Sequence, residues 1–197
     1  MEITASDVAK LRKMTGVGMM EAKNALTEAE GDFDKAIEVL RKRGAAKAAK
    51  KAERETSQGL VHCYEHSNGR IGVIVEVLCE TDFVARNENF VSLCHDLAMH
   101  IAAMSPLYLS SEDIPAEVVA KETEIFKEQL LSEGKPEDML DKIVEGKLKK
   151  WYEEVCLINQ AFIKDEDMTI EDLIQQKILS IGENIKIGRF QRIELGE

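Results

Sequence analysis

The chain has 197 residues, of which 44% are hydrophobic, so it is long and apolar enough to bury the core of one or two globular domains. It contains no run of about 20 apolar residues, the length that spans a bilayer, and its first residues do not resemble a secretory signal, so a bacterial-type cytoplasmic protein is expected rather than a membrane or secreted one. The net charge of −11 argues against direct nucleic-acid binding, because such binding depends on neutralising phosphates.

The first 44 residues contain three short helical patterns separated by glycines, which predict a compact three-helix module. Thr4 and Asp7 form a capping box for the first helix. The second helix begins with Met19 and Met20. One of these methionines can face the three-helix core while the other must point elsewhere, and flexible thioethers suit protein contacts.

The segment 45–59 is rich in alanine and charge and holds almost nothing to bury, so it is predicted to be either a solvated helical extension or a linker. A domain boundary is therefore placed between residues 54 and 55. Eight basic residues run through this region, and three interpretations stay open: a solvated face, a docking site for an acidic protein, or a contact with RNA. They are Lys35, Arg41, Lys42, Arg43, Lys47, Lys50, Lys51 and Arg54.

Residues 59–80 carry two strand-like runs around Ser-Asn-Gly at 67–69, which is a good hairpin signal. In the second run, 71–80, apolar side chains occupy both alternating sets, so this strand is predicted to be central. From Asp82 to Met104 the apolar residues follow a helical period, and one long helix is expected to pack on the sheet. The positions that set this period are Val84, Val91, Cys94, Ala98 and Ile101.

Two further helices are predicted at 116–131 and 137–156, and another ends at Gly182, after which a final strand should complete the sheet. The predicted fold class is therefore α+β. It consists of a three-helix module at residues 1–54 and a core at residues 55–197, in which a small antiparallel sheet packs against helices.

The histidines and cysteines do not have the spacing of a metal site. A structural zinc site usually has paired short spacings such as Cys-x2-Cys, which are absent, and strand alternation would place His62 and Cys63 on opposite faces. No nucleophile elbow, phosphate loop or dinucleotide-binding glycine motif is present, and adjacent Cys94 and His95 on a helix do not face each other. The sequence thus predicts no metal, no cofactor and no enzyme activity, with the cysteines as buried reduced thiols.

Phe83 has two interpretations. At 100° per residue it falls at the same angle as Ile101, so periodicity favours a place in the core. It also lies in the first helical turn, where Thr81 or Asp82 is the natural N-cap and a side chain can project past the end of the sheet. The residues alone leave both interpretations open.

Four segments resemble the bacterial translation elongation factor Ts family. Members of that family are guanine nucleotide exchange factors for elongation factor Tu, the GTPase that carries aminoacyl-tRNA to the ribosome. The match runs nearly end to end, and the resemblance implies this activity in translation elongation without a cofactor. The segments are TGVGMMEAKNAL (15–26), RKRGAAKAAKK (41–51), GRIGVIVEVLCETDFVARNENF (69–90) and IGENIKIGRFQRIELG (181–196).

The resemblance also implies roles for particular residues. The family's TDFV motif inserts into the GTPase near its nucleotide-bound magnesium, disturbs the metal and loosens GDP. Met19 and Met20 match paired methionines through which the N-terminal module, of the ubiquitin-associated type, touches the GTPase domain. The residues that match the TDFV motif are Thr81, Asp82, Phe83 and Val84.

The chain has one sheet segment where longer family members carry a second core repeat. Similar short members work as homodimers, so the resemblance implies a homodimer built partly on the C-terminal strand. No cysteine follows Cys156, which excludes a disulfide across that strand. The alternative, from another functional class, is a ubiquitin-associated-like adaptor whose N-terminal module binds helical peptides and whose core only dimerises.

Overall fold

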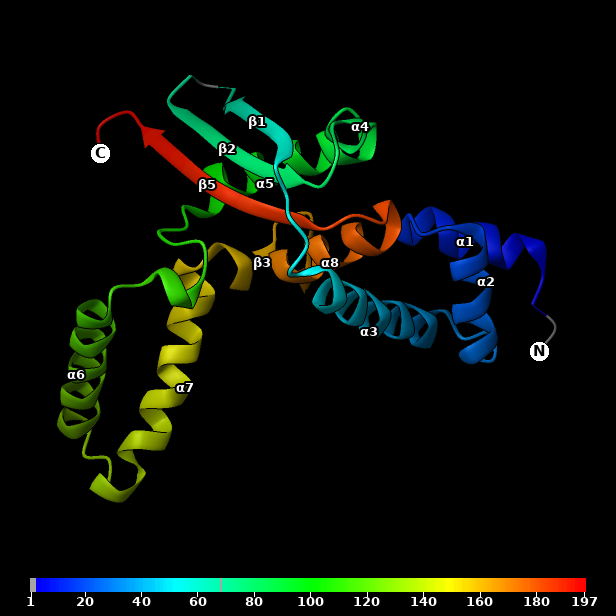
Figure 1. Ribbon diagram of the computed structural model, residues 1–197. Helices are drawn as coiled ribbons and strands as arrows, with labels where there is room; N and C mark the ends of the chain where they lie inside the picture. Colours follow the sequence, from blue (N-terminus) through cyan, green and yellow to red (C-terminus); the bar gives the residue numbers. More distant parts are fainter. Residues whose placement is uncertain (1–2, 68) are drawn as a thin grey trace. The chain divides into compact units, whose positions relative to one another are not determined.

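The computed structural model describes residues 3–67 and 69–197. The described chain forms two compact units: residues up to 102 together with 171–197 make the first unit, and 103–170 make the second. The first contains a three-stranded antiparallel sheet with several helices, and the second contains two long helices and a two-stranded sheet (Figure 1). This combination confirms the predicted α+β class.

Three helices, α1 (Ala5–Thr15), α2 (Met19–Glu28) and α3 (Phe33–Lys51), open the first unit as predicted. α1 begins at the predicted capping box: the Asp7 amide donates to the Thr4 hydroxyl oxygen at 3.3 Å, and the Thr4 amide donates to the Asp7 carboxylate at 3.0 Å. The helices share one apolar core. Its buried members are Val8, Leu11, Val17, Ala22, Ala25, Leu26, Ala29, Ala36, Leu40 and Leu179.

α3 is longer than the glycine pattern predicted. Its end was expected before Gly44, but the helix continues to Lys51, so the first part of the alanine-rich segment is a helical extension. Gly44 is buried, and a Cβ at this position would lie 3.3 Å from the backbone oxygen of Gln175 on α8 (Ile170–Ile181). This glycine therefore lets two helices approach closely instead of ending one. The domain boundary placed just after this helix stays a prediction.

The three-stranded sheet consists of β1 (Gln58–Glu65), β2 (Ile71–Cys79) and β5 (Ile185–Glu194) in the order β1-β2-β5, with antiparallel neighbours. The predicted hairpin, the central position of β2 and the final strand are thus confirmed. Asn68, in the middle of the predicted turn, lies outside the described residues.

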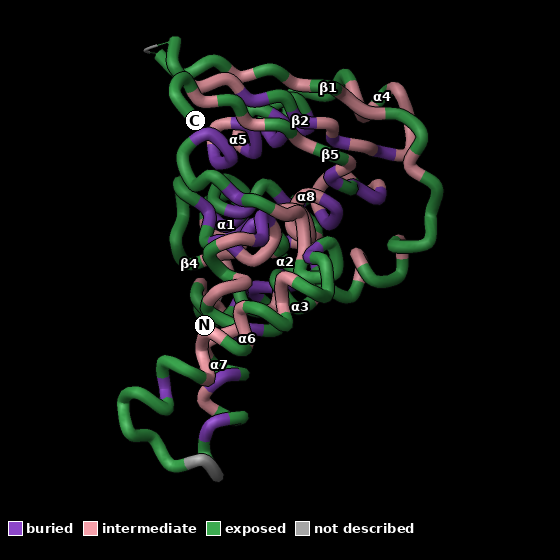
Figure 2. Tube along the Cα trace, turned by 90° about the vertical axis from the view of Figure 1, so that its left-hand side faces the viewer, coloured by how far each residue is buried: buried purple, intermediate pink, exposed green. Residues whose placement is uncertain are grey.

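The two faces of this sheet differ in burial. On one face the side chains of β2 are buried, and α5 (Glu88–Met104) runs along that face (Figures 1 and 2). α5 is fixed at both edge strands, where His95 contacts His62 of β1 and Arg192 of β5 donates to the Ala102 carbonyl oxygen at 3.2 Å. The opposite side, termed here the open sheet face, carries exposed side chains in register: Val61, Cys63, Ile74 and Ile193.

α4 (Asp82–Ala85) and α5 replace the single long helix that was predicted. α5 begins after Asn87, whose side-chain oxygen accepts a hydrogen bond from the Asn89 amide at 2.9 Å. Val91, expected in the apolar stripe, is 37% exposed, because at 100° per residue it lies at the edge of the buried stripe of α5. The buried positions of α5 are Phe90, Leu93, Cys94, Leu97, Ala98, His100, Ile101 and Ala102.

In the second unit, α6 (Ala116–Ser132) and α7 (Glu137–Val155) confirm the two helices predicted there. They contact each other through a small apolar core whose buried residues are Leu130, Leu140 and Val144. The shorter elements are two 3-10 turns, Ser111–Asp113 and Leu157–Asn159, and the strands β3 (Ala161–Phe162) and β4 (Asp165–Thr169). Within residues 3–67 and 69–197, no helix has the length and apolar character to cross a membrane.

Candidate partner-binding site

Phe83 lies on α4 with 83% of its surface exposed, more than any other large hydrophobic side chain in the described part of the chain. The core interpretation of this residue is therefore wrong. It rested on extending the period of α5 back through residue 83, and the two helices are separate. None of the four residues of α4, all described, is buried, although the helix contacts β1 and β2.

The other residues of the TDFV segment have distinct local roles. Thr81 is the N-cap of α4, and its hydroxyl oxygen accepts from the Val84 amide at 3.4 Å. The Asp82 carboxylate forms an ion pair with Arg86 at 3.0 Å, one helical turn later. Asp82 is partly exposed beside the Phe83 ring. The segment thus presents a carboxylate next to an aromatic side chain at the surface.

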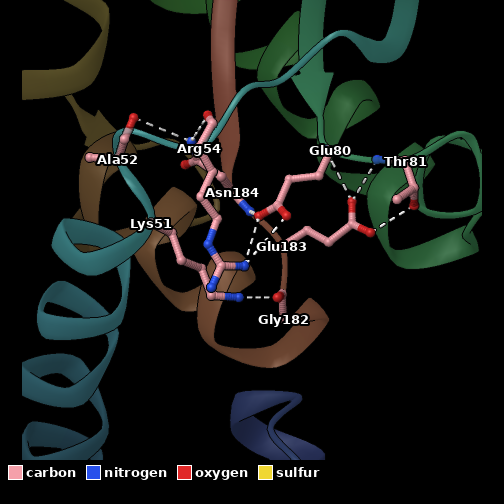
Figure 3. A network of polar contacts seen from close by, with 8 residues as sticks. All are labelled: Lys51, Ala52, Arg54, Glu80, Thr81, Gly182, Glu183 and Asn184. Carbon is pink, nitrogen blue, oxygen red and sulfur yellow. Dashed lines mark hydrogen bonds and ion pairs between the residues drawn. The ribbon is translucent and has the colours of Figure 1, made fainter.

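A single carboxylate holds the start of α4 (Figure 3). Glu183 lies in the turn between α8 and β5, and its Oε2 accepts from the amides of Glu80 and Thr81 at 3.1 and 3.0 Å. Its Oε1 accepts from the Thr81 hydroxyl at 2.7 Å. In addition, the Cys79 thiol donates to the Thr81 carbonyl oxygen at 3.2 Å, and burial followed by the nearby Glu183 charge raises the pKa of that thiol.

The same turn is joined to the end of the N-terminal helices (Figure 3). The Asn184 amide donates to the Glu80 carboxylate at 2.6 Å, and its buried side chain donates to the carbonyl oxygens of Ala52 and Arg54. The Lys51 ammonium donates to the Gly182 carbonyl oxygen. Sequence reasoning missed this network, because nothing in the local pattern around residue 183 indicates a partner 102 positions away.

Met19 and Met20 begin α2 and are 48% and 65% exposed. The expectation that one of them faces the three-helix core is wrong, because Ala22, Ala25 and Leu26 occupy the buried positions of α2. α2 packs on α1 and α3, whereas α4 packs on β1 and β2. The two predicted sets of partner-binding residues therefore form two separate surfaces of the first unit.

Much of the basic run is ion-paired within the chain. Arg43 bridges Glu21 and Glu28 at 3.2 and 2.6 Å, and Lys47 also reaches Glu21 at 3.3 Å. Lys42 pairs with Glu38, and Arg54 with Glu80. The Arg43 and Lys47 pairs fasten α3 to α2, and the Arg54 pair joins the segment after α3 to Glu80, the residue after β2. These contacts favour a structural role for the basic residues over a contact with RNA. Ion pairs are formed by Lys35, Lys42, Arg43, Lys47 and Arg54.

The histidines and cysteines are dispersed. His62 and His95 contact each other at 3.3 Å, and burial together with the neighbouring His95 lowers the pKa of His62. Among the described residues no group of three or more His, Cys, Asp or Glu side chains can hold a metal ion. Cys63 is exposed, which corrects the prediction that all the cysteines are buried, whereas Cys94 is fully buried and has its pKa raised to about 12.

Comparisons with known proteins agree with the motifs. The family described as Elongation factor TS matches residues 2–197. The chain is 56% identical over 197 residues to Elongation factor Ts of Fervidobacterium nodosum, covering 100% of both chains. It is 57% identical over 195 residues to Elongation factor Ts of Moorella thermoacetica, covering 99% of this chain and 96% of the relative, and 57% identical over 195 residues to that of Thermosipho melanesiensis, covering 99% and 100%. The chain therefore belongs to the elongation factor Ts family of translation elongation factors.

Proposed function

We propose that this protein is the guanine nucleotide exchange factor for elongation factor Tu. It binds the GTPase, disturbs its Mg²⁺ site and promotes GDP release so that GTP can bind. The observation that carries the proposal is the 83% exposure of Phe83 beside Asp82 on a helix with no buried residue among its four described positions. Such a side chain adds little to the packing of its own chain and is free to contact another protein.

Phe83, exposed on α4, is called the wedge here, because it is proposed to insert into the GTPase. Such a wedge acts through the difference between its affinities for two conformations of the GTPase. It shifts the GTPase only to the extent that it binds the conformation with weak Mg²⁺ and phosphate contacts more tightly than the nucleotide-bound conformation. The coupling is reciprocal, so bound GDP weakens the factor by the same ratio that the factor weakens GDP. No bond is made or broken by the factor itself, so it needs no catalytic residue or cofactor of its own.

The second contact in this proposal is the methionine pair. Met19 and Met20 are exposed on α2, and flexible, polarizable side chains adapt well to a protein surface. This surface adds affinity for the GTPase, while α4 supplies the contact that changes nucleotide affinity. The proposed setting is the cytoplasm, without direct nucleic-acid binding.

The test is release of a fluorescent GDP analogue from elongation factor Tu. Added protein should accelerate release, and Phe83→Ala should lower the maximal rate about 30-fold or more, because truncating an aromatic hot spot costs about 2 kcal/mol or more. The fold should survive, since surface substitutions usually change the free energy of unfolding by less than about 0.5 kcal/mol.

The matched control is Leu107→Ala, which truncates another exposed apolar side chain, 69% exposed, in the second unit. It should leave the release rate unchanged. If the unaltered protein does not accelerate release, the exchange activity is refuted. The alternative, a ubiquitin-associated-like adaptor without exchange activity, is then favoured.

We also propose that the protein forms a homodimer through the open sheet face. Val61, Ile74 and Ile193 are 56%, 45% and 69% exposed there, and the registers β1-β2 and β2-β5 place them on one side of the sheet. The same face also carries the polar side chains of Glu76 and Gln191, so its apolar residues form a patch bordered by polar groups, an arrangement typical of a protein interface. A second copy would cover it and would include the C-terminal strand in the interface.

A further inference from the structure

α4 is a helix that packing holds only in part, through contacts with β1 and β2. It has four residues, all described, and none of them is buried. A single helical turn is unstable on its own, because nucleation fixes several backbone dihedrals for few hydrogen bonds. The direction in which Phe83 points therefore depends on the polar contacts at the start of the helix as well as on the contacts of α4 with the two strands.

Those contacts converge on Glu183. Its carboxylate accepts three hydrogen bonds, from the Glu80 amide at 3.1 Å, the Thr81 amide at 3.0 Å and the Thr81 hydroxyl at 2.7 Å (Figure 3). The Thr81 hydroxyl oxygen in turn accepts from the Val84 amide, inside α4. One side chain from the far end of the sequence thus fixes both the entry of the chain into α4 and the cap of the helix.

We propose that Glu183 is the positioning residue of the exchange site, one that acts through α4 and does not touch the partner itself. The proposal rests on the exchange function proposed above. Phe83 can favour one conformation of the GTPase only if α4, which carries it, keeps its position when the partner binds. If α4 can rotate away, the partner is still bound but its nucleotide site is no longer disturbed.

The turn that carries Glu183 is itself held on two sides. Asn184, only 2% exposed, donates its side-chain amide to the Arg54 carbonyl oxygen at 3.1 Å and its backbone amide to Glu80 at 2.6 Å. Asn184 is followed directly by β5, which pairs with the central strand. The anchor of α4 is thereby tied to the segment that follows α3 and to the sheet, so Glu183 has little freedom to follow α4 outward.

Three variants separate this role from general stabilisation. Glu183→Ala removes all three acceptor contacts, whereas Glu183→Gln keeps the shape and one acceptor oxygen, which can still serve the amides of Glu80 and Thr81. The matched control is Asp113→Ala in the second unit. That change removes a carboxylate that accepts from the Ser110 amide at 2.8 Å and the Ser110 hydroxyl at 2.6 Å, in a similar turn far along the sequence from α4.

The first measurement is hydrogen exchange of the free full-length protein. In Glu183→Ala the amides of residues 80–85 should exchange at least about tenfold faster, while those of α5 keep their protection. Asp113→Ala should leave residues 80–85 unchanged, and Glu183→Gln should fall between the unaltered protein and the alanine variant. Unchanged exchange at residues 80–85 in Glu183→Ala would overturn the proposal.

The second measurement is the GDP-release rate as a function of factor concentration. Glu183→Ala should lower the maximal rate about tenfold with a much smaller change in the half-saturating concentration, and Glu183→Gln should recover most of the rate. In a Phe83→Ala background, Glu183→Ala should have little further effect, because both changes act on the same wedge. Additive losses, or a full maximal rate in Glu183→Ala, contradict the proposal.

The two measurements fail separately. If the unaltered protein does not accelerate GDP release, the proposed function is wrong, and hydrogen exchange still decides whether Glu183 holds α4. If release is accelerated but residues 80–85 are equally protected with and without Glu183, the exchange function stands and the positioning role is wrong.

Discussion

In the free protein, the aromatic ring of Phe83 contributes little to the stability of the fold. A buried phenylalanine contributes its apolar area to the core, but this ring is 83% exposed and sits on a helix anchored by polar groups. Its apolar surface becomes useful only when a partner removes it from water. The Asp82–Arg86 ion pair beside it keeps the surroundings polar, which fits a site that stays solvated until it is bound.

The cysteines provide a prediction at the same scale. Cys79, Cys94 and Cys156 are buried, and burial raises the pKa of each thiol, to about 12 for Cys94. The reactive thiolate of Cys94 is then a fraction of about 10⁻⁴ at pH 8, so the native protein should not be alkylated there by iodoacetamide. Only Cys63 is exposed within a single chain.

Mass spectrometry after alkylation at pH 8 checks this expectation. The native protein should carry at most one modification, at Cys63, and the protein unfolded in urea should carry four. Rapid modification of Cys94 in the native state would show that α5 opens easily or packs differently.

At the scale of elements, the glycines of α3 and α7 give a matched test of packing. A Cβ at Gly44 would lie 3.3 Å from the Gln175 backbone oxygen on α8, whereas a Cβ at Gly146 meets nothing within 4 Å. Gly44→Leu should lower the free energy of unfolding by about 1–3 kcal/mol through overpacking. Gly146→Leu should raise it by about 0.5–1 kcal/mol, because leucine favours a helix interior more than glycine does.

Urea unfolding of the two variants measures both effects. Opposite signs are expected for the same substitution at the two sites. Equal stabilisation would mean that α3 and α8 separate without cost, and that the close approach at Gly44 does not matter for stability.

Sequence patterns predicted helices and strands well where the hydrophobic periodicity runs without interruption. Apolar residues on both faces of β2 were sufficient to identify a central strand, and the capping box at Thr4 located the start of α1. The helix after β2 was mispredicted because Asn87 breaks it, although an asparagine followed by glutamate is a usable start signal. Gly44 predicts a helix end by its type alone, because a close approach by α8 cannot be inferred from the sequence of α3.

The candidate site was only partly predictable for a similar reason. Phe83, Asp82 and the methionine pair could be named from the sequence because the family resemblance covers them. Their support could not, since Glu183 reaches Thr81 across 102 positions and its neighbours Gly182 and Asn184 read simply as a turn before a strand. Long-range polar contacts of this kind leave no periodic signal.

At the scale of the whole molecule, the proposed homodimer makes the open sheet face testable. Ile193→Asp places a charge among the exposed apolar side chains and should convert the dimer to a monomer, because an unpaired buried charge at an interface is strongly unfavourable. Sedimentation over a range of micromolar concentrations measures the change. Leu131→Asp on α6, at a side chain that is 50% exposed, is the control and should leave the dimer intact.

Cys63 reports on the same interface. It lies on the open sheet face opposite Ile74, so dimer formation should slow its alkylation and Ile193→Asp should restore the fast rate. An unaltered protein that sediments as a monomer, with Cys63 reacting at the same rate in both forms, rules out this interface.

The pairing of β2 with β5 also has a consequence for how the protein is made. About 100 residues separate the two strands, so at translation rates of about 5–20 residues per second the central strand waits roughly 5–20 s for its second neighbour. During that interval the nascent chain also lacks Glu183, and the start of α4 has no anchor. We expect that an interrupted or prematurely terminated chain neither completes the sheet nor presents the wedge, so truncated products do not compete with the finished factor for its GTPase.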